Sequence, residues 1–120
     1  MKFKFYSQPD IMDCGPTCLR MIAKHFGRNI SLEKLRGLSE TTREGSSLKT
    51  LSDAAERIGF RSIGVKVSII KLIEDAPLPC IVHWGQYHFV VLYKIKGHLN
   101  LTRRPLVFFI ADPAHGVLQY

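Results

Sequence analysis

The sequence predicts an α+β fold, in which a helical N-terminal half packs on a C-terminal antiparallel β-sheet. Apolar residues recur at helical spacing up to Gly59, and after Gly59 they alternate or form the short unbroken runs that are typical of strands. Helices that precede a run of strands are typical of this class. A chain of 120 residues suits one domain, and no repeat or linker divides it. We therefore expect residues 1–120 to form a single domain.

The first predicted helix follows Asp13, a candidate N-cap. Gly15-Pro16 suits the first turn, because proline lacks the N–H group that would be unpaired there. Apolar side chains then recur at helical spacing until Gly27: Cys18, Leu19, Ile22, Ala23 and Phe26.

Two further helices are expected before Gly59. Ser31 begins a short one over residues 32–35, although its capping box is incomplete. After the polar loop 41–47, Ser47 opens a third helix that Gly59 ends. The apolar residues on one side of this third helix are Leu48, Leu51, Ala54, Ala55 and Ile58.

Strand patterns dominate the second half of the chain. Residues 60–67 alternate as a half-buried strand does, and residues 68–75 suit a short helix or turn. The run 88–96 is apolar on both faces up to Lys94, as expected of a central strand that is covered on both sides. The other predicted strands are 79–84, 106–112 and 116–120.

Charge and cysteine content limit the classes of function. The formal net charge of +7 would attract anionic lipid, acidic peptides or nucleic acid. Only Arg103-Arg104 are adjacent basic residues, so we disfavour nucleic-acid binding. Three cysteines, an odd number at uneven spacing, fit a reducing compartment. No apolar run reaches the roughly 20 residues that span a bilayer. We expect a soluble, cytoplasmic domain.

Cys14 is the first candidate for chemistry. A thioredoxin-type redox pair requires C-x-x-C spacing, whereas Cys14 and Cys18 are four positions apart. A zinc site could recruit Cys80, His83 and His88. However, Cys80 and His83 are three positions apart on a predicted strand, so they point to opposite faces. We therefore expect neither a metal nor a cofactor in this domain.

The choice that remains for Cys14 is between a nucleophile and an inert core residue. A thiolate at a helix N-terminus is stabilised by unpaired N–H groups and by the helix dipole, and Cys14 has such a position. Cys18 and Cys80 lie in apolar patterns, and because free cysteines are commonly buried we prefer core packing for both. Position alone leaves both interpretations of Cys14 open.

A cysteine nucleophile needs a base and a group that orients the base. His88 begins the most apolar strand, where an imidazole is costly to bury without a partner. Asp112 ends the neighbouring apolar run and could accept a hydrogen bond from His88 if the two strands pair. The alternatives are a core histidine and a turn cap before Pro113. Three other histidines are weaker candidates for the base. His25 lies at the end of the first predicted helix, where it can interact with the helix dipole, His98 lies in a polar turn and His115 lies in a loop.

Four separated blocks of sequence carry a family resemblance. They are QPDIMDCGPTCLRMI (8–22), TTREGSSLKTLSDAAERIGF (41–60), YHFVVLYKI (87–95) and ADPAHG (111–116). Together they resemble the N-terminal peptidase domain of bacteriocin-exporting ABC transporters, papain-like cysteine proteases that remove double-glycine leader peptides. The similarity covers nearly the whole chain and follows the family's order.

The resemblance implies a papain-like fold and a role for each of four residues. Cys14 would be the nucleophile, His88 the general base and acid, and Asp112 the residue that orients His88. Gln8 matches the family's oxyanion-hole glutamine. An amide N–H from Gln8 and the backbone N–H of Cys14 would stabilise the tetrahedral intermediate.

The resemblance also implies a substrate and partners. Members of the family cut after Gly-Gly or Gly-Ala and recognise an amphipathic leader helix on an apolar groove. The third helix matches the region that lines this groove, so Leu48, Leu51 and Ala55 are the candidates, although plain core packing suits each equally well. The chain would be the N-terminal module of an exporter, on the cytoplasmic side of the bacterial plasma membrane. ATP and magnesium would bind a separate part of that exporter.

The sequence alone leaves two questions open: whether the domain is catalytically active, and whether Asp112 faces His88. A catalytically weak or inactive relative that only docks secretion substrates is the main alternative, and the presence of Cys14 argues against it. The segment 97–109 is a longer join than the family's hairpin. A slip of one residue in the strand pairing would turn Asp112 away from His88.

Overall fold

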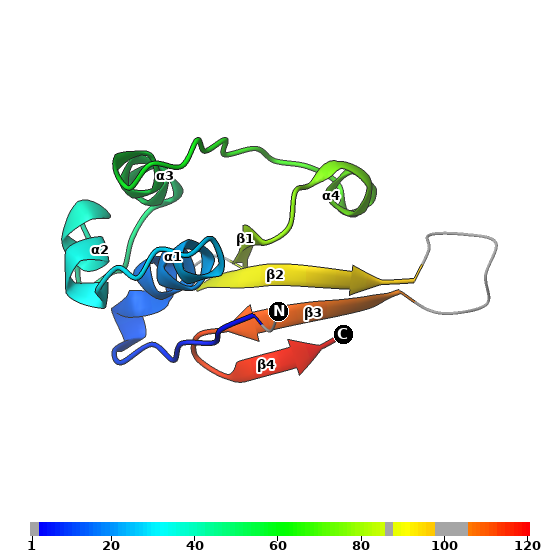
Figure 1. Cartoon of the computed structure of the whole chain (residues 1–120), viewed down its shortest axis with the longest axis horizontal. Coiled ribbons are helices and arrows are strands. Elements are labelled where there is room, and N and C mark those ends of the chain that lie inside the picture. The colour runs from blue at the N-terminus through cyan, green and yellow to red at the C-terminus, as the bar shows by residue number, and fades with distance from the viewer. Residues whose placement is uncertain (1–2, 86–87, 98–105) are drawn as a thin grey trace.

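The computed structural model describes residues 3–85, 88–97 and 106–120, which form an α+β fold (Figure 1). Its helices are α1 (Cys14–His25), preceded by the 3₁₀ turn η1 (Ile11–Asp13), α2 (Leu32–Leu38), α3 (Leu48–Arg57) and α4 (Ile69–Asp75). The strands β1 (Cys80–Trp84), β2 (His88–Lys96), β3 (Val107–Asp112) and β4 (Gly116–Gln119) form one antiparallel sheet in chain order. The predicted fold class is confirmed. No helix in these ranges has the length and apolar character needed to cross a membrane.

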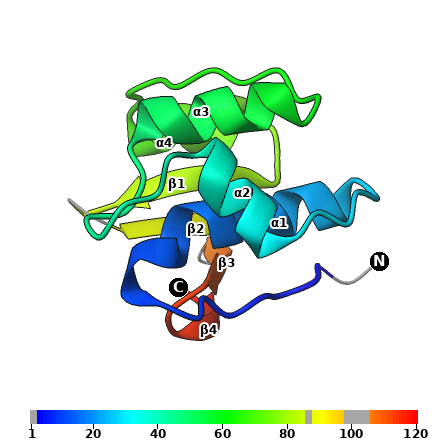
Figure 2. The ribbon, with the colours of Figure 1, turned by 90° about the vertical axis from the view of Figure 1, so that its left-hand side faces the viewer.

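The main core lies between α1 and the sheet. Figure 2, which looks along the sheet from one end, shows α1 and α2 in front of the strands and α3 above them. Removing these apolar side chains from water fixes α1 against β2 and β3. The buried residues that make this contact include Cys18 and Leu19 of α1, Leu35 of α2, Leu51 and Ala54 of α3, and Phe89, Val91 and Ala111 of the sheet.

A smaller apolar cluster covers the other face of the sheet. Val90, Leu92 and Ile110 are buried there, and Leu72 of α4 packs partly against them. Because successive residues of a strand point to opposite faces, burial of both Val90 and Val91 means that β2 is covered on both sides. The prediction for strand 88–96 is confirmed.

A bulge in β2 sets its register against β3. Leu92 pairs with Ile110 and Lys94 pairs with Phe109, so Tyr93 is an extra residue. Past the bulge, the ladder aligns Asp112 with Val90, on the same face as His88. A ladder continued straight from the Lys94 pair would instead place Asp112 opposite Val91, on the face toward α1. The long join has therefore not turned Asp112 away. Most of that join, with His98 and Arg103-Arg104, lies outside the described residues, as does Tyr87.

The segment 60–67 is not a strand, contrary to the sequence-based prediction. It connects α3 to α4 and pairs with no strand in the described ranges. The side chains of Ile63 and Val65 are 85% and 63% exposed. Alternation of apolar and polar residues shows which side chains share a side, but it does not show whether a partner strand is available. Here no edge of the sheet accepts the segment, so its apolar residues lie on the surface.

The helix starts are partly as predicted. Ser31 and Ser47 each accept a hydrogen bond from the backbone N–H three residues on, which confirms both as N-caps. Asp13 occupies the N-cap position of α1, as predicted, but its side chain makes no capping hydrogen bond. Its carboxylate is bound instead by the guanidinium of Arg36, which holds both carboxylate oxygens away from the helix N–H groups.

Candidate active site

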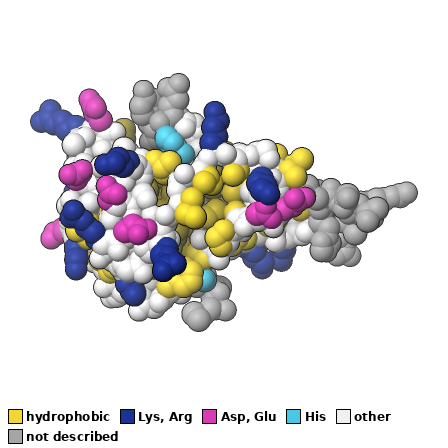
Figure 3. Space-filling view, turned by 90° about the horizontal axis from the view of Figure 1, so that it is seen from above, with side chains coloured by type: hydrophobic (Ala, Val, Ile, Leu, Met, Phe, Trp, Pro, Cys, Tyr) yellow, Lys and Arg dark blue, Asp and Glu magenta, His cyan; other side chains and the backbone are white. Residues whose placement is uncertain are grey.

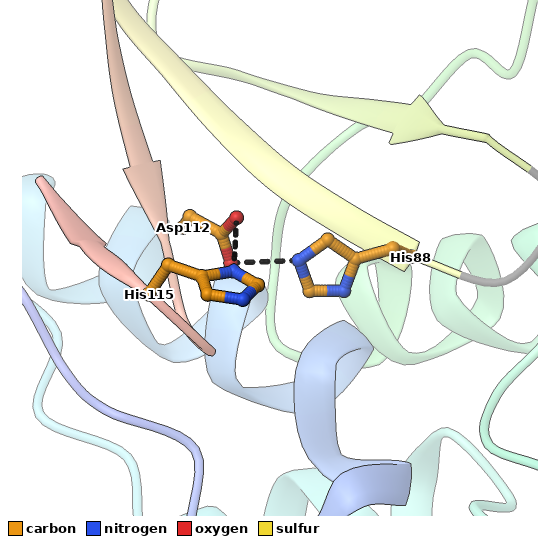
Figure 4. Close-up of side chains that lie close together, drawn as sticks. All are labelled: His88, Asp112 and His115. Carbon is orange, nitrogen blue, oxygen red and sulfur yellow. Dashed lines mark hydrogen bonds and ion pairs between the residues drawn. The ribbon is translucent and has the colours of Figure 1, made fainter. Parts of the chain in front are cut away.

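His88 and Asp112 meet at one end of the sheet. His88 is the first residue of β2 and Asp112 is the last of β3, and the two strands are antiparallel neighbours, so their ends coincide. Nε2 of His88 lies 2.7 Å from Oδ1 of Asp112 (Figure 4). The side chains are 28% and 10% exposed, respectively. The structure therefore brings together the two residues that were predicted to pair.

Three N–H donors hold the carboxylate of Asp112. Oδ1 accepts from His88 and from the backbone N–H of Ala114 at 2.9 Å, and Oδ2 accepts from Nδ1 of His115 at 3.0 Å. Burial by itself raises the pKa of this carboxyl, but the hydrogen bonds from His88, His115 and Ala114 outweigh burial and lower it. The carboxylate is therefore charged at neutral pH.

The charged carboxylate fixes the proton on the His88 ring. A carboxylate only accepts hydrogen bonds, so Nε2 of His88 carries the proton that lies between them. The other ring nitrogen, Nδ1, points away from Asp112 (Figure 4). In the neutral ring Nδ1 then has a free lone pair, and His88 can act as a base toward a group on that side.

Cys14 is the first residue of α1 and is 4% exposed. Helix α1 packs on β2, and Sγ of Cys18 donates to the carbonyl of Phe89, the residue directly after His88, at 3.3 Å. Cys14 lies one turn before Cys18 and belongs to the same buried cluster as Phe89 and Ala111. The start of α1 is thus at the end of the sheet that carries His88 and Asp112, as Figure 1 shows for the helix and the strands.

The other two cysteines are held as thiols. Burial raises the pKa of Cys18 well above its usual value, and the nearby Cys14 and Asp112 raise it further. Burial also raises the pKa of Cys80, to about 11. Cys18 is buried in the main core, as predicted, whereas Cys80 is only partly buried, against the smaller apolar cluster.

An ion pair anchors the residue that precedes Cys14. Nε and Nη2 of Arg36 lie 2.8 Å and 2.7 Å from the two carboxylate oxygens of Asp13. Asp13 is fully buried, and such a two-point contact is geometrically specific. It ties the start of α1 to α2 and so restricts the position of Cys14.

Gln8 lies beside the turn that follows Asp112. Its backbone N–H donates to the carbonyl of Pro113 at 2.9 Å. Its side-chain Nε2 donates to the carbonyls of Asp10 and Ile11, at 2.9 Å and 3.3 Å. Oε1 is buried without a hydrogen-bond partner in the described part of the chain. These bonds keep Gln8 next to η1, and its role in an oxyanion hole stays a prediction.

His115 belongs to this cluster, and sequence reasoning assigned it only to a loop. It sits in the tight turn between β3 and β4, three residues after Asp112, and its side chain is 70% exposed. The spacing D-x-x-H within a turn closed by Gly116 was the available signal, because a four-residue turn returns its fourth residue toward its first.

Only one of the three predicted groove residues is accessible. Leu48 is 45% exposed, whereas Leu51 and Ala55 are 3% and 8% exposed and belong to the main core. Leu51 faces Gly15 of α1. Leu51 and Ala55 therefore pack α3 against the main core, and of the three residues only Leu48 is available at the surface.

The chain matches known proteins along nearly its whole length. The model of the peptidase C39 family matches residues 2–120. The chain is 36% identical to the lactococcin-G-processing and transport ATP-binding protein LagD of Lactococcus lactis, over 97% of this chain and 16% of that protein. It is 32% identical to the colicin V secretion/processing ATP-binding protein CvaB of Escherichia coli, over 92% of this chain and 14% of that protein. The chain thus spans about one sixth of the length of these relatives.

The chain is also similar to solved structures of peptidase domains along nearly its whole length. A double-glycine-motif protease from an AMS/PCAT transporter, in complex with the leader peptide, superposes with a TM-score of 0.89 at 29% identity, covering 99% of this chain and 79% of that one. The peptidase domain of Streptococcus ComA gives a TM-score of 0.77 at 28% identity, covering 99% and 86%. With its fold and sequence both shared with these proteins, the chain belongs to the peptidase C39 family and is a papain-like cysteine peptidase domain of the kind found in bacteriocin-processing ABC transporters.

Proposed function

We propose that this domain removes the leader from precursor peptides by cutting after a double-glycine motif, with Cys14, His88 and Asp112 as its catalytic triad. The observation that carries the proposal is the 2.7 Å hydrogen bond between His88 and Asp112, at the end of the sheet where α1 begins with Cys14. A nucleophile, a base and a group that orients the base are the three parts that cysteine proteases need.

The first step is proton transfer from Cys14 to His88. With Nε2–H held by Asp112, Nδ1 of His88 takes the thiol proton and leaves a thiolate at the start of α1. Unpaired N–H groups of the first helical turn stabilise that negative charge. Asp112 in turn stabilises the imidazolium that forms.

The thiolate then attacks the carbonyl of the second glycine. The bond to the next residue breaks as His88 returns the proton to the leaving amine, and the leader stays attached to Cys14 as a thioester. A water molecule, deprotonated by His88, hydrolyses the thioester and frees both the leader and Cys14. The backbone N–H of Cys14 and the amide of Gln8 are our candidates to stabilise the oxyanion in both steps. For Gln8 this requires its amide to exchange its present backbone partners, Asp10 and Ile11, for the substrate.

An exposed apolar strip is the candidate surface for the leader. It comprises Leu48 of α3, Ile63, Val65 and Val67 of the connecting segment, and Ile69 and Ile70 of α4, each at least 44% exposed. Gly64 of the connecting segment lies against Leu48, so α3 and this segment are adjacent. Figure 3 shows hydrophobic side chains gathered in this region, with charged groups around them. Such a strip suits the apolar face of an amphipathic helix.

The precursor and an exporter are the proposed partners. Relatives of the chain are processing and transport ATP-binding proteins, and one structural neighbour holds a leader peptide. By analogy, we infer that the domain works as the N-terminal module of an ABC exporter on the cytoplasmic side of the membrane. The separate ATP-binding part of that exporter would use ATP and magnesium, and the chemistry proposed for this domain needs neither.

The test is cleavage of a precursor whose leader ends in Gly-Gly, followed by mass spectrometry. Wild-type protein should release leader and core peptide at that bond, Cys14→Ala should release neither, and Cys80→Ala should cut normally because its thiol is outside the site. Equal cleavage by Cys14→Ala would refute the mechanism. Binding of the precursor without cleavage by the wild type would favour a docking domain instead.

A further inference from the structure

We propose that His88, Asp112 and His115 form a binding site for a divalent transition-metal ion such as Zn²⁺, and that the bound ion holds the peptidase inactive. The inhibitory half of this proposal rests on the roles proposed above for Cys14 and His88. The ion would be a reversible inhibitor and not a resident cofactor.

The three side chains offer a suitable set of ligand atoms. One atom from each residue, two imidazole nitrogens and one carboxylate oxygen, lie within 4.8 Å of one another. Two histidines and a carboxylate with one open position are a common zinc ligand set. Tetrahedral bonds of 2.0–2.2 Å would place ligand atoms about 3.3 Å apart. The present N–O separations are 2.7 Å and 3.0 Å, so small side-chain rotations suffice.

The charge of the cluster favours a cation. Asp112 carries a negative charge in a side chain that is 10% exposed, and both groups facing it are imidazoles, which are neutral when unprotonated. A carboxylate between two neutral rings keeps a net charge of −1. A divalent cation would replace the protons on both His88 and His115 as the partner of that carboxylate.

The site is accessible from the side of the sheet away from α1. His88, Asp112 and His115 line an open cavity of about 610 Å³ together with apolar side chains of the strands. Of the described residues that line it, none belongs to α1. The side chain of His115 is 70% exposed. An ion can therefore reach the three ligands without passing Cys14.

The bound ion would block catalysis through the proton on His88. A metal on Nε2 needs the lone pair there, so the neutral ring must carry its proton on Nδ1. Nδ1 is the atom that has to accept the proton of Cys14. A metal-bound His88 is thus locked in the tautomer that cannot act as the base, even though the thiol itself is untouched.

Binding is tested on Cys14→Ala protein, because this variant removes the thiol as a competing ligand. ZnCl₂ is titrated calorimetrically into Cys14→Ala, into Cys14→Ala with His115→Ala, and into Cys14→Ala with His25→Ala. His25 is an exposed imidazole at the far end of α1 and serves as the matched control. We expect one ion per chain, with binding at least tenfold weaker when His115 is replaced and unchanged when His25 is replaced. His115→Asn provides a second variant, and circular dichroism verifies folding.

If the two His115 variants bound zinc as tightly as the Cys14→Ala protein, the proposed metal site would be refuted. This arm needs no cleavage, so it stands apart from the proposed peptidase activity. In the second arm, Zn²⁺ should inhibit cleavage by the wild type, EDTA should restore it, and His115→Ala should need at least tenfold more Zn²⁺ for half inhibition. Inhibition that does not depend on His115 would overturn the inhibitory role. Absence of cleavage in metal-free wild type would count against the proposed function and leave the binding result intact.

Discussion

At the residue scale, the carboxylate of Asp112 decides which nitrogen of His88 carries the proton. It accepts from Nε2 at 2.7 Å and leaves Nδ1 as the basic atom. The pair could be predicted from the sequence because His88 begins one apolar run and Asp112 ends the neighbouring one. The sequence did not reveal that His115 and Ala114 also donate to the same carboxylate, since those bonds depend on how tightly the turn closes.

Replacing Asp112 should therefore lower turnover more than substrate binding. In Asp112→Ala the His88 ring loses its orienting partner, and we expect kcat to fall on the order of 100-fold, with a much smaller change in KM. Steady-state cleavage of a Gly-Gly precursor measures both constants. Asp53→Ala, which removes an exposed carboxylate on α3, is the control and should leave both unchanged. An Asp112→Ala enzyme with wild-type kcat would remove Asp112 from the mechanism.

Because of the same carboxylate, the free energy of unfolding should depend on pH in the acid range. The pKa of Asp112 is lower in the folded protein than its usual value, so the charged form stabilises the fold. That contribution is complete above the unfolded-chain pKa of about 3.9 and is lost as pH falls through the lower folded pKa. The free energy of unfolding of the wild type should thus fall more steeply below about pH 4 than that of Asp112→Asn. Urea titrations from pH 6 to pH 2.5 measure this, with Asp53→Asn as the control; parallel curves for wild type and Asp112→Asn would contradict it.

At the element scale, the apolar residues of α3 lie in two different environments. Leu51 is 3% exposed in the main core, and Leu48 is 45% exposed beside the connecting segment. Sequence periodicity placed both on one side of the helix. Periodicity could not show that Leu51 is buried and Leu48 exposed, because it does not indicate how far neighbouring elements cover that side of the helix.

Substitutions should distinguish these two environments of α3. Leu51→Ala removes buried methyl groups and should lower the free energy of unfolding by about 3 kcal/mol. Leu48→Asp should keep nearly wild-type stability but raise KM for the precursor at least tenfold, because it places a charge on the proposed apolar strip. Thermal denaturation and cleavage kinetics of both variants give the result. Unchanged KM in Leu48→Asp, with the fold intact, would place the leader elsewhere.

The strands show what apolar patterns in the sequence can and cannot predict in this fold. The runs 88–96 and 106–112 are apolar enough to be central, and both were predicted correctly. The segment 60–67 has an equally clear alternation and forms no strand. The apolar residues of this segment lie on the surface instead, where Ile63, Val65 and Val67 join Leu48 in the apolar strip. An exposed apolar surface and a half-buried strand can thus have the same sequence signature.

At the scale of the whole molecule, the proposed catalytic residues of the sheet and the apolar strip lie on different elements. His88 and Asp112 belong to the sheet, whereas the strip runs from α3 to α4. A precursor that touches both is held twice, and the second contact becomes intramolecular once the first has formed. The family resemblance implies this division, because one block of sequence carries the proposed docking helix and other blocks carry the proposed catalytic residues.

Shortening the leader should consequently weaken cleavage through KM. A short peptide that keeps the Gly-Gly bond but lacks the amphipathic helix reaches the triad without the second contact, so its KM should rise at least tenfold while kcat changes much less. The isolated leader helix, added separately, should inhibit cleavage of the full precursor competitively, since it occupies the strip without presenting a bond to Cys14. It should not accelerate cleavage of the short peptide, because remote binding is useful only within one molecule. Equal kcat/KM for the short and the full substrate would show that the sheet end alone recognises the precursor.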